Sequence, residues 1–546
     1  MGVETVESEW DRVKTALTDT CKEKLGHRTQ TYKSWLKEDT IVKIEERRIL
    51  KQKVLIAKTR AQKLQSQTEY TTLNKEVKKM SRRDKRTFID NMANKAQEAA
   101  GRQDLKSLYD ITRRIVGHKA DTGKPIKAKD GSTLTKPADQ LERWKEHFSE
   151  ILNGPSAEDL PVVEEGEELE VNMGPITSDE ICGAVRKTKS GKAPGIDNIP
   201  PEALKADSRT TADVMQKLLQ DIWEKEEIPE EWKTWIIIKL PKKGDLGDCN
   251  NWRGIQLLSL PSKILARILL ERLKTGIDST LRDEQAGFRP NRSCTDQIAA
   301  LRIIIEQSLE WQAPIYMNFI DFRKAFDMID RRMIWKIMKH YGIPEKFINI
   351  IRSFYEGMTC QVVHNSDLSP SFAVTTGVWQ GCLLSPVIFL LVIDWVLKKT
   401  MGEPRGLQWT FTKRLEDLDF ADDICLMSHT LQHIQEKTDR LQQTAESTGL
   451  AINTCKTKSM RINAAQNRPV TIQNSQVEEV TNFTYLGSVV STSGGTEEDI
   501  RSRIGKAMYA FVTLRPIRKN SNISLPTKLK LFNSNVLTVL LYGSET

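Results

Sequence analysis

The sequence LEDLDFADDICLMS, from Leu415 to Ser428, places two adjacent carboxylates, Asp422 and Asp423, in front of a compact apolar run. The run from Ile424 to Met427 predicts a buried strand, and the carboxylate pair is expected at the tip between two strands. Two like charges a few ångströms apart raise each other's pKa and cost stability unless a cation lies between them. Aspartate is also a common turn residue, so a solvated hairpin turn is the alternative interpretation of the pair alone.

A third carboxylate, upstream of this pair, favours the metal interpretation. The stretch MNFIDFRKAFD spans Met317 to Asp327, and the apolar residues from Ile315 to Ile320 predict a short strand. Asp321 stands where this strand stops, and a helix is expected to begin near Lys324. A carboxylate at a strand end beside an Asp-Asp hairpin predicts a site for two hard divalent cations. Because Mg²⁺ combines few carboxylates with substrate phosphates, the pattern also predicts a phosphate-bearing substrate.

The composition is that of a soluble globular protein with room for several subdomains. The chain has 546 residues, of which 28% are charged and 39% hydrophobic. The longest apolar run, Val387 to Leu397, is too short to span a bilayer, and the acidic, polar first residues give no signal peptide. Eight cysteines without any C-x-x-C pair argue against a zinc site or a disulfide framework. We therefore expect a reducing compartment, cytoplasmic and nuclear, and no membrane partner.

The charge is unevenly distributed along the chain. The first 120 residues hold 28 Lys and Arg against 17 Asp and Glu, whereas the whole chain has a net charge of +9. The most basic point of a long predicted helix contains Lys78, Lys79, Arg82 and Arg83, which we expect to contact nucleic-acid phosphates. The alternative is a solvated, salt-bridged helix face. Residues 158 to 170 contain seven acids and no base, which predicts a linker and a domain boundary.

Several basic or glycine-rich loops suit a triphosphate or a nucleic acid. Lys242 follows a predicted strand from Trp235 to Leu240, and Arg253 follows in NNWRGI; two such points can clamp a triphosphate. Gly191-Lys192 lies in a basic loop that lacks the spacing of a Walker A motif. His147 lies on the apolar face of a short predicted helix and is expected to be packed, since no partner stands at ligand spacing.

The order of motifs resembles the reverse transcriptases of non-LTR retrotransposons, most closely RTE-type elements that encode an endonuclease–reverse transcriptase polyprotein. The resemblance covers residues 176 to 546 and rests on an ordered set of motifs: GKAPGIDNIPPEAL, NNWRGI, EQAGFRPNRSCTDQI, FIDFRKAFD, GVWQGCLLSP, LDFADD, GLAINTCKT and FTYLGS. It implies an α+β right-hand polymerase with fingers over 176–314, palm over 315–490 and the start of a thumb over 491–546. A helical N-terminal extension over 1–155 and an acidic linker over 156–175 would precede it.

The resemblance also implies roles for the residues that match the motifs. Asp321, Asp422 and Asp423 would bind metal, and Lys456 would stand near the leaving pyrophosphate. Phe326 would be the steric gate against a ribose 2′-OH, and Lys242 and Arg253 would touch the triphosphate. Gln380 and Gly381 would contact nucleotide and template, Arg289 would bind nucleic acid, and the primer grip would contain Tyr485, Leu486 and Gly487. Trp379 departs from the family, which usually has Arg or Lys there; this predicts a weaker template or nucleotide contact, or a decaying copy.

The implied activity is RNA-directed DNA synthesis onto a primer 3′-OH, with two Mg²⁺ ions and Mn²⁺ as a substitute. The implied partners are an RNA template, a DNA primer and deoxynucleoside triphosphates. The endonuclease of the full-length element is missing from this chain, which therefore resembles a fragment. One alternative is a catalytically inactive, retrotransposon-derived nucleic-acid-binding protein, and another is an interaction protein whose functional part is the basic helices within residues 1–120.

Overall fold

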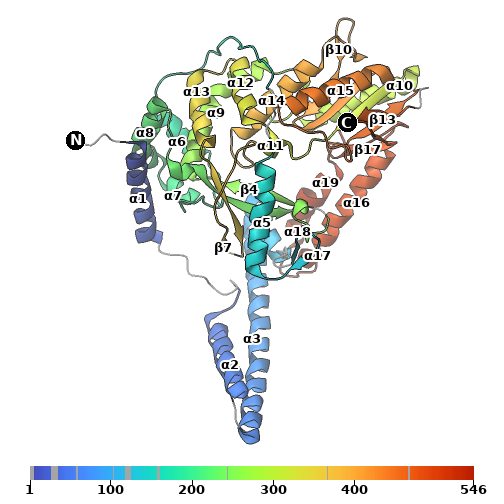
Figure 1. The fold of residues 1–546 in the computed structure, drawn as a ribbon. Coiled ribbons are helices and arrows are strands. Elements are labelled where there is room, and N and C mark those ends of the chain that lie inside the picture. Colours follow the sequence, from blue (N-terminus) through green and yellow to red (C-terminus); the bar gives the residue numbers. More distant parts are fainter. Residues whose placement is uncertain are drawn as a thin grey trace. The chain divides into compact units, whose positions relative to one another are not determined.

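The computed structural model describes residues 5–25, 35–56, 59–101, 104–116, 125–155, 160–242, 244–365, 367–464 and 468–546. They form two compact units (Figure 1). The first unit comprises Met1–Gly26, Gly123–Glu498 and Thr546, and the second comprises His27–Thr122 and Asp499–Glu545. Both helices and sheets are present, so the predicted α+β class is confirmed.

A five-stranded sheet in the first unit carries the predicted carboxylate strands, in the order β11–β12–β5–β13–β16. Its strands are β5 (Ile315–Ile320), β11 (Asp417–Phe420), β12 (Asp423–Ser428), β13 (Lys458–Ile462) and β16 (Glu478–Glu479). All neighbours pair antiparallel except β13 and β16. All six residues of β5 are buried, as expected for a strand covered on both faces.

Alternate residues of β5 serve the two faces of this sheet. Tyr316 and Ile320 belong to the core that includes α15 (Leu431–Ser447) and the neighbouring α14 (Ser385–Thr400). Met317 and Phe319 belong to the core that includes α10 (Cys294–Trp311) and the hairpin β17 (Asn482–Tyr485)–β18 (Ser488–Ser491). The ring of Phe319 stacks on that of Phe483, with centroids 4.1 Å apart.

A second sheet has the order β4–β3–β6–β7, with β8 pairing with β6. Strands β3 (Thr234–Pro241) and β4 (Trp252–Leu257) form an antiparallel hairpin, which confirms the predicted strand at Trp235 to Leu240, whereas β3 and β6 run parallel. The other strands are β6 (Thr359–His364), β7 (Asp367–Leu368) and β8 (Phe372–Ala373). The helices of the same unit are α6 (Ser178–Arg186), α7 (Pro201–Ala206), α8 (Ser208–Lys225), α9 (Leu260–Thr280), α11 (Ala325–Met328), α12 (Arg331–His340) and α13 (Glu345–Tyr355), with 3₁₀ turns at Glu230–Lys233 and Cys249–Asn251.

Smaller elements complete the first unit. A hairpin around Asp130-Gly131 pairs β1 (Ile126–Lys127) with β2 (Thr133–Leu134), and α5 (Pro137–Leu152) follows it. Two further hairpins pair β9 (Leu407–Gln408) with β10 (Arg414–Leu415), and β14 (Thr471–Ile472) with β15 (Ser475–Gln476). None of the described helices has both the length and the apolar character that crossing a bilayer requires.

The N-terminal 155 residues do not form the single extension that the sequence predicts. Helix α1 (Val6–Leu25) packs in the first unit, where the Trp10 indole meets the Trp232 ring edge-on with centroids 5.4 Å apart. The Trp10 N–H also donates a 2.7 Å hydrogen bond to Glu231. Helices α2, α3 and α4 belong instead to the second unit. The reason is a set of long-range aromatic and polar contacts that no local pattern in the sequence reveals.

The acidic segment is not a free linker over its described part, residues 160–175. Its backbone binds the end of α12: the Gly166 N–H donates to Lys339 (3.2 Å) and the Leu169 N–H donates to Gly342 (2.7 Å). A Cβ on Gly342 would lie only 1.8 Å from the Glu167 carbonyl oxygen, so this close approach requires glycine there. Apolar side chains between the acids pack on the core: Leu160, Val163, Leu169 and Val171. Residues 156–159 of the expected linker lie outside the described part.

The second unit joins the basic helices to the C-terminal residues. Helices α2 (Glu38–Ile56) and α3 (Arg60–Gly101) lie side by side (Figure 1), so the long basic helix predicted around Lys78 is one of a pair. Buried Asp84 ties the pair together, because it accepts hydrogen bonds from the Thr40 hydroxyl (2.6 Å) and the Lys37 N–H (3.1 Å). The other helices are α4 (Leu105–Val116), α16 (Glu497–Thr513), α17 (Arg515–Arg518), α18 (Leu525–Phe532) and α19 (Thr538–Leu540), with a π-helical turn at Asn533–Leu537.

Candidate active site

Three carboxylates meet at one end of the five-stranded sheet. In the register of β5 with β12, Ile320 pairs with Ile424, so Asp321 and Asp423 follow at the next position. Phe420 pairs with Asp423 across the β11–β12 hairpin, and Ala421 and Asp422 form its two-residue turn. The predicted Asp-Asp hairpin beside a third carboxylate at a strand end is therefore present in the structure.

The electrostatics of this corner suit a cation. Burial, then the charges of Asp422 and Asp321, raise the pKa of Asp423 to about 6. Burial also raises the pKa of Asp422, and the charge of Asp321 adds to this. The Oδ2 atom of Asp321 is buried without a hydrogen bond, and the Lys456 ammonium is the cation beside it, 3.4 Å away.

The three carboxylates fit a divalent ion whose remaining ligands come from a bound substrate. Among the described residues, no group of three or more His, Cys, Asp or Glu side chains is arranged as a ready-made metal site. Mg²⁺ is commonly bound by one or two carboxylates together with substrate phosphates, so a preformed protein cage is not required. The mutual repulsion of the three acids, which have one Lys456 ammonium beside Asp321, is the feature that a bound cation would relieve.

The predicted triphosphate contacts lie in the same region. Lys242 ends the β3 side of the hairpin and Arg253 lies on β4. Burial lowers the pKa of Lys242, and the nearby charges of Arg253 and Lys456 lower it further. Lys242, Arg253 and Lys456 repel one another, so together they favour binding of an anion such as a triphosphate.

The predicted nucleotide-contacting residues are held by a shared network. The Phe326 ring stacks on Phe389 with centroids 4.1 Å apart, which fixes its orientation. The Gln380 carboxamide donates to Asp327 (3.1 Å), whose pKa burial raises to about 6. Gly381 has φ +131°, and a Cβ there would lie 2.6 Å from the Gln256 carbonyl oxygen. The close approach predicted for Gly381 is therefore to strand β4.

Trp379 is a core residue in this structure. Its ring stacks on Tyr355 at 4.1 Å and meets Trp235 edge-on at 3.8 Å between centroids. Only 3% of the residue is exposed. The departure from the family pattern thus has a packing explanation, and the indole fills space between β3 and α13.

Arg289 and Tyr485, two of the expected nucleic-acid contacts, are buried in contacts within the protein. The Arg289 guanidinium is buried and donates to Asp278, to the Arg282 carbonyl and to the Gln285 carbonyl, so it braces its own loop. Tyr485 is buried and its hydroxyl donates to the Leu418 carbonyl (3.0 Å), because β17 packs on the sheet. Leu486 and Gly487 form the turn of that hairpin, with φ of +47° and +89°. The role of Tyr485, Leu486 and Gly487 as a primer grip stays a prediction.

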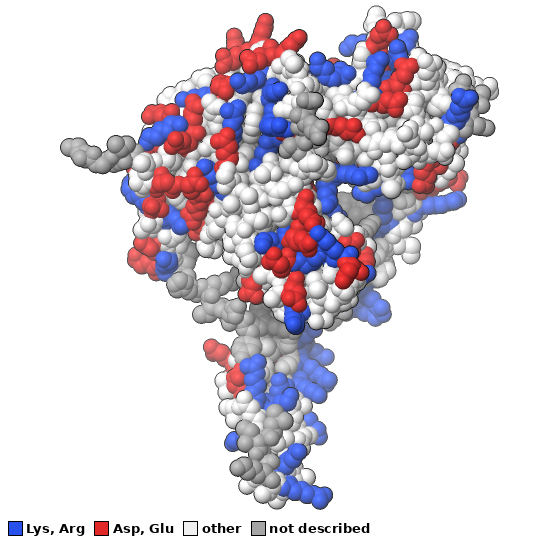
Figure 2. Space-filling view, in the orientation of Figure 1, with Lys and Arg blue, Asp and Glu red and all other residues white. Residues whose placement is uncertain are grey.

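The basic helix residues lie in the second unit. Lys78, Lys79, Arg82 and Arg83 are all exposed on α3, and Figure 2 shows Lys and Arg side chains along the α2–α3 pair. Arg83 lies 3.8 Å from Asp84, whose charge is already used in joining the two helices. These four side chains are therefore exposed to solvent, and their contact with nucleic-acid phosphates stays a prediction.

A buried cluster of charged residues, which the sequence did not predict, holds strand β11 of the carboxylate hairpin. Arg282 binds three fully buried acids: Asp394 (3.1 Å), Asp417 (2.7 Å) and Asp419 (2.5 Å). Burial and the charge of Asp417 raise the pKa of Asp419 well above its usual range, while Arg282 opposes the shift. The signal was available in LEDLDF, where Asp417 and Asp419 share one face of an otherwise buried strand and so require a buried base.

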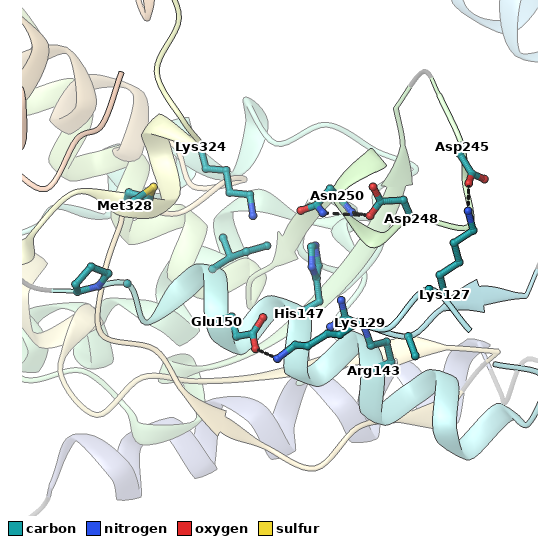
Figure 3. A pocket seen from close by; sticks show the side chains of 15 residues that line it. Lys127, Lys129, Arg143, His147, Glu150, Asp245, Asp248, Asn250, Lys324 and Met328 are labelled. Carbon is teal, nitrogen blue, oxygen red and sulfur yellow. Dashed lines mark hydrogen bonds and ion pairs between the residues drawn. The ribbon is translucent and has the colours of Figure 1, made fainter. Parts of the chain in front are cut away.

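A cavity of about 690 Å³ lies beside the start of α11 (Figure 3). Lys127 pairs there with Asp245 (2.9 Å), and Lys129 pairs with Glu150. His147 lines the same cavity, and burial lowers its pKa to about 4. The predicted packing of His147 is confirmed, since its ring lies edge-on to Phe148 at 5.2 Å between centroids.

Comparison with known proteins agrees with this geometry. Residues 240–490 match the family "Reverse transcriptase (RNA-dependent DNA polymerase)", and residues 510–542 match a domain of unknown function. The transposon TX1 149 kDa protein of Xenopus laevis is 27% identical over 56% of this chain and 24% of its own length. The RNA-directed DNA polymerase from mobile element jockey of Drosophila funebris is 23% identical over 91% of this chain and 55% of its own length. A solved apo telomerase from Candida tropicalis matches with a TM-score of 0.38 and 13% identity, over 57% of each chain.

The sheet with its carboxylate corner lies within the residues that match the reverse transcriptase family. Residues 240–490 are a reverse transcriptase domain of the kind found in non-LTR retrotransposons. Enzymes of this family generally use divalent metal ions. The chain spans about a quarter to about half of the length of these two curated relatives.

Proposed function

We propose that this chain copies RNA into DNA by adding deoxynucleotides to a primer 3′-OH, with two Mg²⁺ ions at Asp321, Asp422 and Asp423. The observation that carries the proposal is the meeting of Asp321 with the Asp-Asp turn at one corner of the sheet, where burial and the neighbouring carboxylates raise the pKa of Asp423 to about 6. Mn²⁺ would substitute for Mg²⁺, since both are hard ions that oxygen ligands accept. An RTE-type element, whose full-length product includes an endonuclease, is the proposed source.

The proposed reaction needs little covalent chemistry from side chains. When bound, the two metal ions would lower the pKa of the 3′-OH and stabilise the leaving pyrophosphate. Asp321 and the Asp-Asp turn would hold those ions at fixed positions, which supplies most of the rate by orientation and charge. Lys456, 3.4 Å from Asp321, would neutralise charge that develops on the pyrophosphate.

The remaining residues would select and orient the substrates. Lys242 and Arg253 would bind the triphosphate from the β3–β4 hairpin. Phe326, fixed by its stack on Phe389, would present a flat wall to the sugar and exclude a 2′-OH. Gln380 would orient the base pair from a loop that Arg331 holds through bonds to the Gly377, Val374 and Thr376 carbonyls.

The alternative, a nucleic-acid-binding protein without activity, loses one of its arguments. Trp379 suggested a decaying copy, but its close aromatic packing gives it a structural use. Localisation to cytoplasm and nucleus remains a proposal.

The test is primer extension with charge-removing variants. Asp321→Asn and Asp422→Asn are expected to abolish extension while leaving RNA binding unchanged, because phosphate contacts of Lys and Arg carry the affinity. Asp213→Asn, on an exposed position of α8, is the matched control and should extend as the parent does. Substantial activity in either active-site variant would refute the two-metal assignment.

A further inference from the structure

The segment from Arg282 to Arg289 lies along the free edge of the carboxylate hairpin. The Ala286 N–H donates to the Asp419 carbonyl (2.9 Å), and the Asp419 N–H donates to the Glu284 carbonyl (3.4 Å). Gln285 forms a parallel bridge with Asp419. Because β11 is the end strand of its sheet, this segment acts as a short additional strand on the outside of the hairpin.

The side chain of Gln285 reaches the turn itself. Its Oε1 accepts hydrogen bonds from the Ala421 N–H (2.8 Å) and the Gly287 N–H (2.8 Å), and its Nε2 donates to the Ala421 carbonyl (3.4 Å). The residue is fully buried, with 0% exposed. One carboxamide thus binds both backbone groups of the residue that precedes Asp422.

Ala421 needs such support. Its φ is +59°, in the left-handed region that L-residues other than glycine rarely adopt. The segment also fits closely on its other side, because a Cβ on Gly287 would lie 2.3 Å from the Ala421 nitrogen. The segment is anchored at both ends: Arg282 binds three buried acids, and Arg289 binds the Arg282 and Gln285 carbonyls.

We propose that Gln285 is a positioning residue: its carboxamide fixes the left-handed turn at Ala421 and thereby sets where the carboxylates of Asp422 and Asp423 stand relative to Asp321. The proposal rests on the proposed function, in which these carboxylates hold metal ions. Groups that orient metal ligands without touching the metal typically change metal affinity or activity by about 10–100-fold. No shorter side chain would span both backbone groups of Ala421, and a carboxylate would oppose its carbonyl oxygen.

The test uses Gln285→Met, which keeps the side-chain length and removes all three hydrogen bonds. Mn²⁺ binding is measured by electron paramagnetic resonance, hydrogen exchange by mass spectrometry over residues 419–424, and primer extension by kcat and KM for a deoxynucleotide. We expect faster exchange in this segment, Mn²⁺ affinity and kcat each lower by about 10–100-fold, and KM and RNA affinity within about threefold of the parent. Gln140→Met removes a buried Gln that bonds Leu134 and His364 far from the turn, and it should match the parent in metal binding and kcat.

The outcomes separate this proposal from the proposed function. If Asp321→Asn is inactive while Gln285→Met binds Mn²⁺ and turns over as the parent does, the positioning role is refuted and the polymerase assignment stands. If Asp321→Asn extends primers normally, the polymerase assignment itself fails. Should Gln285→Met not fold, Gln285→Glu keeps the Oε1 acceptor but places a carboxylate oxygen against the Ala421 carbonyl; faster exchange over residues 419–424 with weaker Mn²⁺ binding supports the proposal, and parent values for both refute it.

Discussion

Among single charged residues, Arg282 is predicted to be the one whose replacement most destabilises the reverse transcriptase domain. Its guanidinium, 12% exposed, binds Asp394, Asp417 and Asp419, which are all fully buried. Arg282→Met keeps much of the side-chain volume but leaves buried Asp417 and Asp419 without their cation, whereas Asp394 keeps its ion pair with Lys398 (3.0 Å). Removing one partner of a buried ion pair costs about 3–5 kcal/mol, so we expect a loss at or above that range at pH 7.

The pH dependence gives this prediction a sharper form. Without Arg282, which opposes the shift, the pKa of Asp419 would rise further above that of the unfolded chain. The folded variant would then hold protons that the unfolded chain has released, so its stability rises as the pH falls from 7 toward 5. The deficit relative to the parent should therefore shrink over this interval.

The assay is urea unfolding at pH 7 and pH 5, followed by circular dichroism and tryptophan fluorescence. Arg292→Met is the control, because Arg292 pairs with Asp283 at 3.2 Å on the surface and such pairs contribute about 0–1 kcal/mol. An Arg282→Met variant that loses less than about 1 kcal/mol, or whose deficit is the same at both pH values, would refute the reasoning.

Three further predictions follow from single features. Phe326→Val should open space beside the sugar and raise the ratio of ribonucleotide to deoxynucleotide efficiency; an unchanged ratio with normal deoxynucleotide use would place the gate elsewhere. Neutralising Lys78, Lys79, Arg82, Arg83, Lys85 and Arg86 should weaken binding to all sequences alike and reduce the slope of log K against log salt by about 0.7–0.9 per lost contact; an unchanged slope, measured with normal helical content, would mean a solvated face. His147 has a folded pKa of about 4 against 6.5 unfolded, so its contribution is lost as the pH falls through this window, by about 3 kcal/mol at most, and His147→Leu should flatten the acid side of the stability profile.

The sequence predicts the carboxylate corner because its signals are local. The strand before Asp321, the Asp-Asp turn and the strand after it each follow from apolar runs that end in charged residues. Helix α3, which contains Lys78 and Arg83, likewise matches the long basic helix that the sequence predicts there.

The sequence fails where a side chain's direction depends on distant residues. Arg289 stands in a basic loop, yet its guanidinium turns inward to carbonyls that only the folded loop brings near. Trp379 and the buried acids of β11 likewise depend on residues more than twenty positions away. The acidic segment differs from a linker for another reason: its apolar residues stand among the acids, and this pattern is as typical of an extended segment packed on a core as of a linker.

The most direct test of the central claim is copying of RNA by the purified chain. A DNA primer annealed to an RNA template is incubated with the four deoxynucleoside triphosphates and Mg²⁺, and the product is sequenced. The account predicts DNA complementary to the template, formed only when the divalent ion is present. Tight binding of the same primer–template without any extension, in Mg²⁺ or in Mn²⁺, would contradict it and favour a binding protein that has lost its chemistry.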